Sequence, residues 1–289
     1  MNVLLTGASG FIGRNVAAVL ARAGHRVRPL SRRHGADASR MLTPADWLAH
    51  LDGIDAAVNC IGIIGETRTQ HFAPLHTQAP VALFQACAAK GVRRVLQISA
   101  LGADETAFSA YHLSKRAADD FLRALDVDWI VLRPSLVYGA GGGSAALFLR
   151  LARLPLIPVL GDGQQPLQPV HIGDVAAAAL RGLTAAGRQT IDVAGPETIA
   201  FSEWLQRLRA AQGLPRARLL RVPFAAALAM AWLGAWFSPM SRPDNLRMLA
   251  CAAACRAATP PLARLLGRAP TPFAPHLPFA DAMSIGEPS

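Results

Sequence analysis

The first thirteen residues constrain the fold of this chain more than any other stretch. The apolar run from Val3 to Leu5 predicts a buried strand, and TGASGFIG then places Gly7, Gly10 and Gly13 three residues apart, before apolar residues at helical spacing. In a strand–turn–helix unit, the first glycine permits a tight turn, the second lets the backbone approach a pyrophosphate, and the third lets the helix pack close to the sheet. The helix N-terminus adds free amides and a positive dipole end. The segment therefore predicts a dinucleotide-binding turn.

Strand patterns alternate with helical patterns over the first two hundred residues. We expect strands at 3–5, 26–30, 55–62 (as the fourth buried strand), 94–99, 128–139 with its exit, and 190–195, and helices at 77–90 and 201–212. This alternation, with 52% hydrophobic residues, predicts an α/β fold with a doubly wound parallel (Rossmann) sheet. We assign residues 1–195 to the NAD(P)-binding domain, with an insertion near 139–165, and residues 196–289 to a small, mostly helical substrate lobe.

The residues after the second strand bear on the choice of cofactor. An NAD-selective fold places an acidic side chain there to hold the ribose 2′-hydroxyl. This chain instead has Ser31, Arg32 and Arg33. A guanidinium group matches the oxygens of a 2′-phosphate, so the sequence favours NADP(H) over NAD(H), although a solvated loop is the alternative. Farther along, the backbone of residues 60–62 is expected beside the adenosine ribose.

Tyr111 and Lys115 are the leading candidates for chemistry. They stand four residues apart, which on a helix places them on one face. A free tyrosine has a pKa of about 10, too high for acid–base work at neutral pH. A neighbouring ammonium favours its phenolate, and the same lysine can bind the cofactor ribose.

Five segments together carry a family resemblance: TGASGFIG, ISALGA, YHLSK, RPSLVYG and LQPVHIGD, spread over residues 1–200. They resemble the short-chain dehydrogenase/reductase superfamily in its extended and atypical (NAD-dependent epimerase/dehydratase-like) branch. Within that branch they are similar to the accessory subunit of respiratory complex I that carries this fold. The resemblance implies tightly bound NADP(H), with Tyr111 as general acid/base and Lys115 on the ribose. It also implies that the loop after the strand ending near Pro134 lies against the nicotinamide.

The chain departs from the superfamily at one catalytic position. The third catalytic residue is normally Ser or Thr, and here that position holds Ala100. Either Ser99 or Ser109 substitutes for it, or hydride transfer is impaired. The candidate catalytic residues are thus Tyr111, Lys115 and Ser99, and no metal site is expected. The candidate cofactor-binding residues are Gly7, Ser9, Gly10, Phe11, Ile12, Gly13, Ser31, Arg32, Arg33, Cys60, Ile61, Gly62, Ser99, Tyr111, Lys115, Pro134, Ser135 and Val137.

Three functions remain open from the sequence. The leading one is an NADP(H)-dependent oxidoreductase acting on an unidentified carbonyl or alcohol. The second is a non-catalytic, cofactor-bound structural or assembly protein, which Ala100 favours. The third is a sugar-nucleotide epimerase or dehydratase. His171 is interpreted as a packing residue and Asp174 as the cap of a helix at 175–183.

Charge and hydropathy bear on partners and location. The net charge is +10, but the arginines are scattered and no nucleic-acid-binding motif is present, so nucleic acid is not expected as a partner. The four cysteines lack metal-type spacing and are expected to be reduced. Because the chain opens with a strand, no signal peptide is expected, and we predict a cytoplasmic location.

Residues 222–241 form an uncharged stretch of twenty residues. We expect a buried or interfacial helix there, with Phe224, Leu228, Trp232 and Phe237 lining an apolar substrate pocket. The alternatives are a membrane span, against which Pro223 and Pro239 argue, and a peripheral membrane contact.

Overall fold

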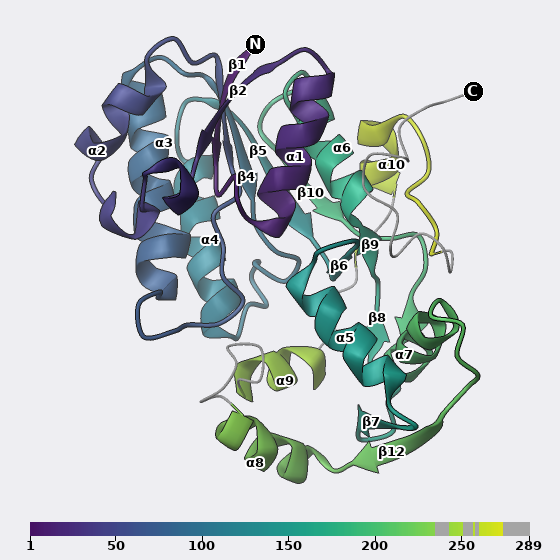
Figure 1. Ribbon diagram of the computed structural model, residues 1–289. Coiled ribbons are helices and arrows are strands. Elements are labelled where there is room, and N and C mark those ends of the chain that lie inside the picture. The colour runs from purple at the N-terminus through teal and green to yellow at the C-terminus, as the bar shows by residue number, and fades with distance from the viewer. Residues whose placement is uncertain (235–242, 251–256, 258–259, 274–289) are drawn as a thin grey trace.

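The computed structural model describes residues 1–234, 243–250, 257 and 260–273, and its centre is a six-stranded parallel sheet (Figure 1). The strands follow the spatial order β10-β5-β4-β3-β1-β2, and all neighbours pair in parallel. Their bounds are β1 Asn2–Thr6, β2 Arg26–Leu30, β3 Ala56–Asn59, β4 Arg94–Ile98, β5 Asp128–Pro134 and β10 Gln189–Val193. The doubly wound α/β fold predicted from the sequence is confirmed.

Helices cover both faces of this sheet because its strands are apolar on both sides. Val3 and Leu5 face one core and Leu4 faces the other, as alternation along a strand requires. The first core is covered by α1 (Phe11–Arg22), α6 (Ile172–Gly182) and α10 (Pro260–Leu266). The second is covered by α2 (Ala45–Leu48), α3 (Ala79–Ala89) and α4 (Ala110–Arg123). The short turns η1 (Arg32–His34) and η2 (Ala38–Arg40) precede α2, and η3 (Ala49–Leu51) follows it.

Two of the expected elements differ from the structure. The strand expected at 55–62 covers only β3, and it is the third strand in the sequence, since residues 31–55 contain no strand. Beyond Asn59 the backbone turns away to form the edge of the site. The helix expected at 77–90 begins earlier, with a wide π-type turn η4 (Ala73–Gln78) that leads into α3.

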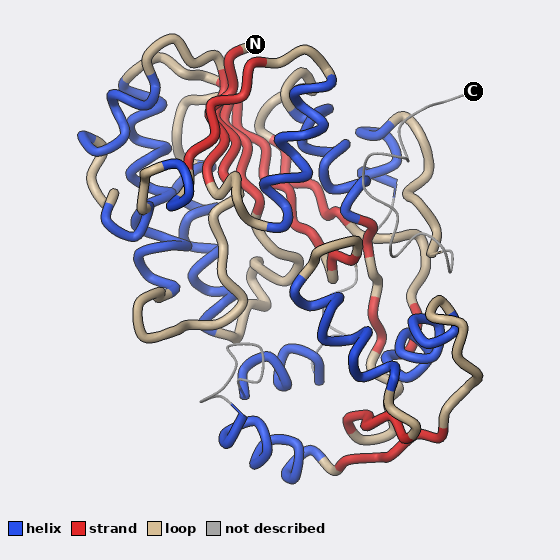
Figure 2. Tube along the Cα trace, in the orientation of Figure 1, coloured by secondary structure: helices blue, strands red, loops and turns tan. Residues whose placement is uncertain are grey.

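The second part of the structure lies beyond the carboxyl ends of the strands, and in Figure 2 it is the mixed region of short strands and helices below the sheet. Three two-stranded pairs occur there: β6 (Val137–Tyr138) with β9 (Val170–His171), β8 (Pro166–Leu167) with β11 (Ile199–Ala200), and β7 (Leu156–Leu160) with β12 (Arg218–Val222). The helices are α5 (Gly143–Arg153), α7 (Phe201–Ala210), α8 (Phe224–Gly234) and α9 (Pro243–Ala250). A third apolar core, with the buried Trp204 at its centre, holds α5 and α7 against these strands.

The role expected for Asp174 is wrong. Helix α6 begins at Ile172, and its cap is His171, whose Nδ1 accepts a hydrogen bond from the amide of Gly173 at 3.0 Å. The fully buried Asp174 carboxylate instead accepts from Arg268 at 2.6 Å and from the amide of Thr271 at 2.7 Å. The carboxylate therefore ties the segment after α10 to α6, and α10 packs beside the sheet rather than in the lobe (Figure 1).

The uncharged stretch 222–241 is described in part. Its first half forms α8, which has eleven residues, and residues 235–242 lie outside the described residues. None of the helices in the described ranges is both long enough and apolar enough to cross a membrane. Cys60 and Cys87 are free thiols, whereas Cys251 and Cys255 lie outside the described ranges.

Candidate functional site

The turn between β1 and α1 has the geometry expected of a phosphate-binding turn. Gly7 adopts a φ of +65°, and a Cβ atom on it would lie 2.5 Å from the carbonyl oxygen of Cys60. A Cβ atom on Gly13 would lie 2.2 Å from the carbonyl oxygen of Gly7, so this glycine lets the helix approach its own turn. Gly10 is the N-cap residue of α1, and no side chain caps the helix. The first amides of α1 are therefore available to an anion.

The other predicted cofactor residues follow the strands that neighbour β1. Ser31, Arg32 and Arg33 come directly after β2, and Cys60, Ile61 and Gly62 come after β3. The ends of β4 and β5 supply Ser99 on one side and Pro134, Ser135 and Val137 on the other. All of these residues lie at the carboxyl edge of the sheet, where open α/β folds bind their ligands. The glycine turn before α1 and this row of strand ends together fit a dinucleotide.

The two arginines after β2 lie on the surface. Arg32 and Arg33 form a 3₁₀ turn with exposed side chains, and Gly35 ends the turn in the left-handed conformation. Beside them Ser31 is buried, and its hydroxyl lies 2.7 Å from Nδ1 of His34. The turn itself contains no acidic residue, but Asp37 follows it. Against the opposing effect of burial, hydrogen bonds from Ser39 and the charges of Arg32 and Arg40 lower the pKa of Asp37, so its carboxylate already interacts with Arg32.

Tyr111, Lys115 and Asp119 lie on one face of α4, at successive steps of four residues. The Lys115 ammonium is buried and donates to the carbonyl oxygens of Ile61 at 2.8 Å and Ile98 at 3.1 Å. It thereby bridges the ends of β3 and β4. Burial lowers the pKa of Lys115 to about 8, against the opposing influence of the Asp119 carboxylate. Burial raises the pKa of Asp119 itself to about 6.

The Tyr111 ring is half-buried among other rings. His76 and His112 meet it edge-on, with ring centroids 5.4 Å and 5.2 Å away, and Phe72 lies 5.9 Å away. Burial, followed by the charge of Asp119, raises the pKa of Tyr111 to about 12. This direction is the reverse of the lowering that the sequence led us to expect from Lys115. In this structure Tyr111 is a phenol, which can donate a proton.

The two serines proposed to replace the missing hydroxyl are both engaged elsewhere. Ser99 donates its hydroxyl hydrogen to the Asp119 carboxylate in a short buried bond. Ser109 caps α4, accepting from the amide of His112 at 3.2 Å, and also lies 3.0 Å from Nδ1 of that histidine. Ala100 itself faces the cavity described next. The structure thus brings Tyr111 and Lys115 together but turns the Ser99 hydroxyl away from the cavity.

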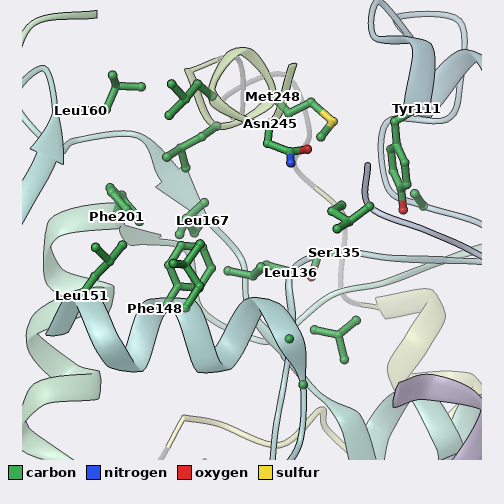
Figure 3. Close-up of a pocket in the computed structure, with 18 of the residues that line it drawn as sticks. Tyr111, Ser135, Leu136, Phe148, Leu151, Leu160, Leu167, Phe201, Asn245 and Met248 are labelled. Atoms are coloured by element: carbon green, nitrogen blue, oxygen red, sulfur yellow. The ribbon is translucent and has the colours of Figure 1, made fainter. Parts of the chain in front are cut away.

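A cavity of about 690 Å³ opens beside Tyr111 and runs into the C-terminal region (Figure 3). Tyr111 lies at one end, and Leu151, Leu160 and Phe201 lie at the other. The polar side chains among its described lining residues are Tyr111, His112, Ser135, Gln168 and Asn245, and no described lining residue carries a carboxylate, a guanidinium or an ammonium group. The cavity is therefore apolar and uncharged over most of its length.

Helix α8 lines this cavity with a face that differs from the predicted one. Ala227, Met230 and Ala231 contact it, whereas Phe224 and Leu228 do not. Phe237 is outside the described residues, and nothing is described of the side chain of Trp232. Gly142 and Gly143 also line the cavity.

Two residues beside the site were not identified from the sequence. His76 is buried, and its Nε2 accepts from the amide of Ile63 at 3.0 Å while Nδ1 lies 3.0 Å from the Ser114 hydroxyl. Burial and then the charge of Lys115 place the pKa of His76 well below its ordinary value, so it is neutral. Asp119 could have been found from its spacing to Tyr111 and Lys115. Nothing in the local sequence marks His76, which comes from a distant turn.

Comparisons with known proteins agree with this geometry. The model of the NAD-dependent epimerase/dehydratase family matches residues 3–194. A ceramide reductase of Caulobacter vibrioides is 29% identical over 84% of this chain and 80% of its own length. A mitochondrial NADH dehydrogenase [ubiquinone] 1 alpha subcomplex subunit 9 of Arabidopsis thaliana is 28% identical over 78% of this chain and 61% of its own.

The crystal structure of gox2253 superposes with a TM-score of 0.69 at 21% identity, covering 98% of this chain and 97% of the other, and so supports the fold. The turn at Gly7, the row of strand ends and the family match together lead to one conclusion. The chain belongs to the NAD-dependent epimerase/dehydratase family of extended short-chain dehydrogenases/reductases, and an NAD(P) cofactor is implied by that membership.

Proposed function

We propose that this protein is an NADP(H)-dependent reductase of an uncharged carbonyl compound with a long apolar tail. The observation that carries this proposal is the cavity beside Tyr111, in which apolar side chains predominate and no charged side chain is found among the described lining residues. A ligand that fills such a cavity leaves water without burying a charge, which favours hydrocarbon over a phosphorylated or carboxylated substrate. The name of the bacterial ceramide reductase fits the same substrate class.

The chain's own residues supply the acid for such a reaction. The bound nicotinamide would provide a hydride for the carbonyl carbon. Tyr111, protonated because burial and Asp119 raise its pKa to about 12, donates its phenolic proton to the carbonyl oxygen. Lys115 holds the ends of β3 and β4 beside the ribose position. The apolar walls exclude water from the reacting centre.

One observation favours the non-catalytic alternative. Ala100 faces the cavity where the superfamily has a hydroxyl, and the hydroxyl of Ser99 is donated to Asp119. Among the described lining residues the only hydroxyl besides Tyr111 belongs to Ser135, which donates to the carbonyl oxygen of Gln168 at 2.5 Å. A cofactor-bound assembly protein needs no such hydroxyl. The sugar-nucleotide alternative is disfavoured, because a nucleoside diphosphate sugar would bury two phosphate charges in an uncharged cavity.

Turnover of defined substrates tests the proposal. Oxidation of NADPH is followed with a homologous series of methyl ketones of increasing chain length, and UDP-glucose serves as the charged comparison. We expect turnover that improves with chain length and none with UDP-glucose. Tyr111→Phe removes the proton donor and should lower turnover roughly 10²–10⁴-fold, while the Kd for NADPH changes little because the ring still packs.

Two results would contradict the proposal. NADPH binding without turnover of any ketone would favour the assembly protein. Turnover of UDP-glucose in place of the ketones would favour the epimerase.

A further inference from the structure

Helix α8 has an unusual surface for a helix at the outside of a protein. Its sequence, FAAALAMAWLG, contains no charged side chain, and the only polar group is the indole N–H of Trp232. Yet Phe224 is 41% exposed and Met230 is 56% exposed, and the alanines at 225, 226 and 229 are exposed as well. Solvent-facing helical surfaces are normally charged or polar. The exposed surface of α8 is instead made of hydrocarbon side chains.

The neighbouring pair of strands extends the same surface. Leu156 on β7 is 43% exposed and Leu220 on β12 is 48% exposed. In the parallel register Leu220 pairs with Pro158, and Val222 pairs with Leu160 two residues later. Side chains two residues apart share a side of a strand, so Leu156 and Leu220 lie on the side that carries Pro158, Leu160 and Val222.

That side of the strand pair leads into the cavity. Pro158, Leu160 and Val222 line the cavity from this side, Val159 lines it from the other side of β7, and Met230 of α8 lines it as well. We call Leu156, Leu220, Phe224 and Met230 the rim face. The apolar surface is therefore continuous from the cavity lining to the outside of the molecule. In Figure 1 β7, β12 and α8 lie together at the end of the molecule farthest from the N-terminus of β1.

The two segments that form the rim face, 151–161 and 213–234, carry only basic charged residues. Arg218 and Arg221 on β12 are exposed, and within the described residues neither forms an ion pair. The exposed Asp162 follows directly after the first of these segments, and the whole chain carries a net charge of +10. Exposed apolar side chains among unpaired arginines are the combination that binds the interface of an anionic bilayer.

We propose that the rim face docks on an anionic lipid bilayer. Leu220, Phe224 and Met230 enter the boundary between head groups and acyl chains, and Arg218, which shares the side of β12 that carries Leu220, contacts lipid phosphates. The mouth of the cavity then opens toward the acyl chains, so that an uncharged lipid reaches Tyr111 without crossing water. This route of entry rests on the proposed reductase activity, whereas the docking does not.

A second copy of the chain fits the rim face less well than a bilayer does. In a symmetric dimer the same patch meets itself, so Arg218 would approach its own copy. Neither of the two segments that form the face contains an acidic residue to offset that repulsion. A bilayer with anionic head groups supplies both the apolar layer and the opposite charge.

Flotation with lipid vesicles tests the docking. The full chain is mixed with vesicles of phosphatidylcholine alone or with added phosphatidylglycerol, and the bound fraction is measured. We expect strong binding to the anionic vesicles. Each of Leu220→Asp and Phe224→Asp should weaken it about tenfold or more. Arg218→Glu should weaken it roughly fivefold or more, and salt should weaken it too. Leu42→Asp, at a side chain 40% exposed on the sheet domain, is the matched control and should bind as the wild type does.

Three results would overturn the docking. The first is a wild-type chain that does not float with anionic vesicles. The second is binding by Leu220→Asp and Phe224→Asp equal to that of Leu42→Asp. The third is a dimer in solution that Leu220→Asp dissociates, because the face would then join two copies.

Turnover measured in parallel separates the two proposals. Leu220 and Phe224 do not line the cavity, so both variants should reduce a short, water-soluble methyl ketone as the wild type does. Loss of vesicle binding with retained turnover would support the docking. Vesicle binding by a chain that reduces no ketone would leave the docking in place and remove the proposed reductase.

Discussion

At the scale of single residues, the buried Asp119 carboxylate is linked to all three candidate catalytic residues: it accepts a hydrogen bond from Ser99, and its charge acts on the pKa values of Tyr111 and Lys115. Tyr111 and Lys115 were found from their spacing, and the structure places both at the carboxyl edge of the sheet. The direction of the tyrosine pKa was not predictable, because it depends on burial and on Asp119, which is two turns away on the same helix. The direction of the Ser99 side chain was equally hidden, since it follows from a bond to that carboxylate.

The cofactor preference is a prediction at this scale. If Arg32 contacts a 2′-phosphate, Arg32→Ala should weaken NADPH binding roughly 10- to 100-fold, because it removes one charge-assisted hydrogen bond. The affinity for NADH should stay unchanged. Titration of cofactor fluorescence measures both constants. Arg26→Ala, at an exposed arginine at the start of β2, is the control. Equal wild-type affinities for NADPH and NADH would show that the two arginines do not select the cofactor.

At the scale of elements, the regular spacing of residues on α4 positions the side chains of the site. Its steps of four residues carry a phenol, an ammonium and a carboxylate into one buried row. The neighbouring strands were predicted from the apolar pattern, whereas the helix was expected only from the spacing of Tyr111 and Lys115. The π-type turn that brings His76 to Tyr111 was not predicted, because a wide turn leaves no mark in hydrophobic periodicity.

This row predicts a pH dependence of reduction. Lys115 is charged below a pKa of about 8, so turnover should fall as the pH rises through that value. The Asp119 carboxylate opposes the effect of burial and raises the pKa of Lys115. Asp119→Asn should therefore move the fall in turnover to lower pH. Asp120→Asn, at the exposed neighbouring acid that pairs with Arg116 and Arg123, should leave the profile unchanged. Identical profiles for all three proteins would exclude this role for Asp119.

At the scale of the whole molecule, the sheet was predictable and the cavity was not. The parallel sheet follows from the alternation of strands and helices, whereas its strand order was not predicted. The cavity, however, is assembled by α5, α8, α9 and short strand pairs whose neighbours are distant in sequence. The expected apolar helix at 222–241 is present in part, but an amphipathic pattern is absent from α8, so its cavity-facing side could not be assigned. The domain boundary at residue 195 stays a prediction.

The sheet domain and the C-terminal region share the cavity, and each holds a different part of the proposed substrate. Tyr111 lies at the sheet end, so the apolar tail of a substrate must extend past α8 toward Leu151 and Leu160. Ala227 lies on the cavity side of α8 and is 8% exposed, whereas its neighbour Ala226 faces solvent. Ala227→Trp should move the preference toward shorter methyl ketones, at roughly 10- to 200-fold in kcat/KM for each methylene that no longer fits. Ala226→Trp should keep the wild-type preference, and the same shift in both variants would mean that the tail does not pass α8.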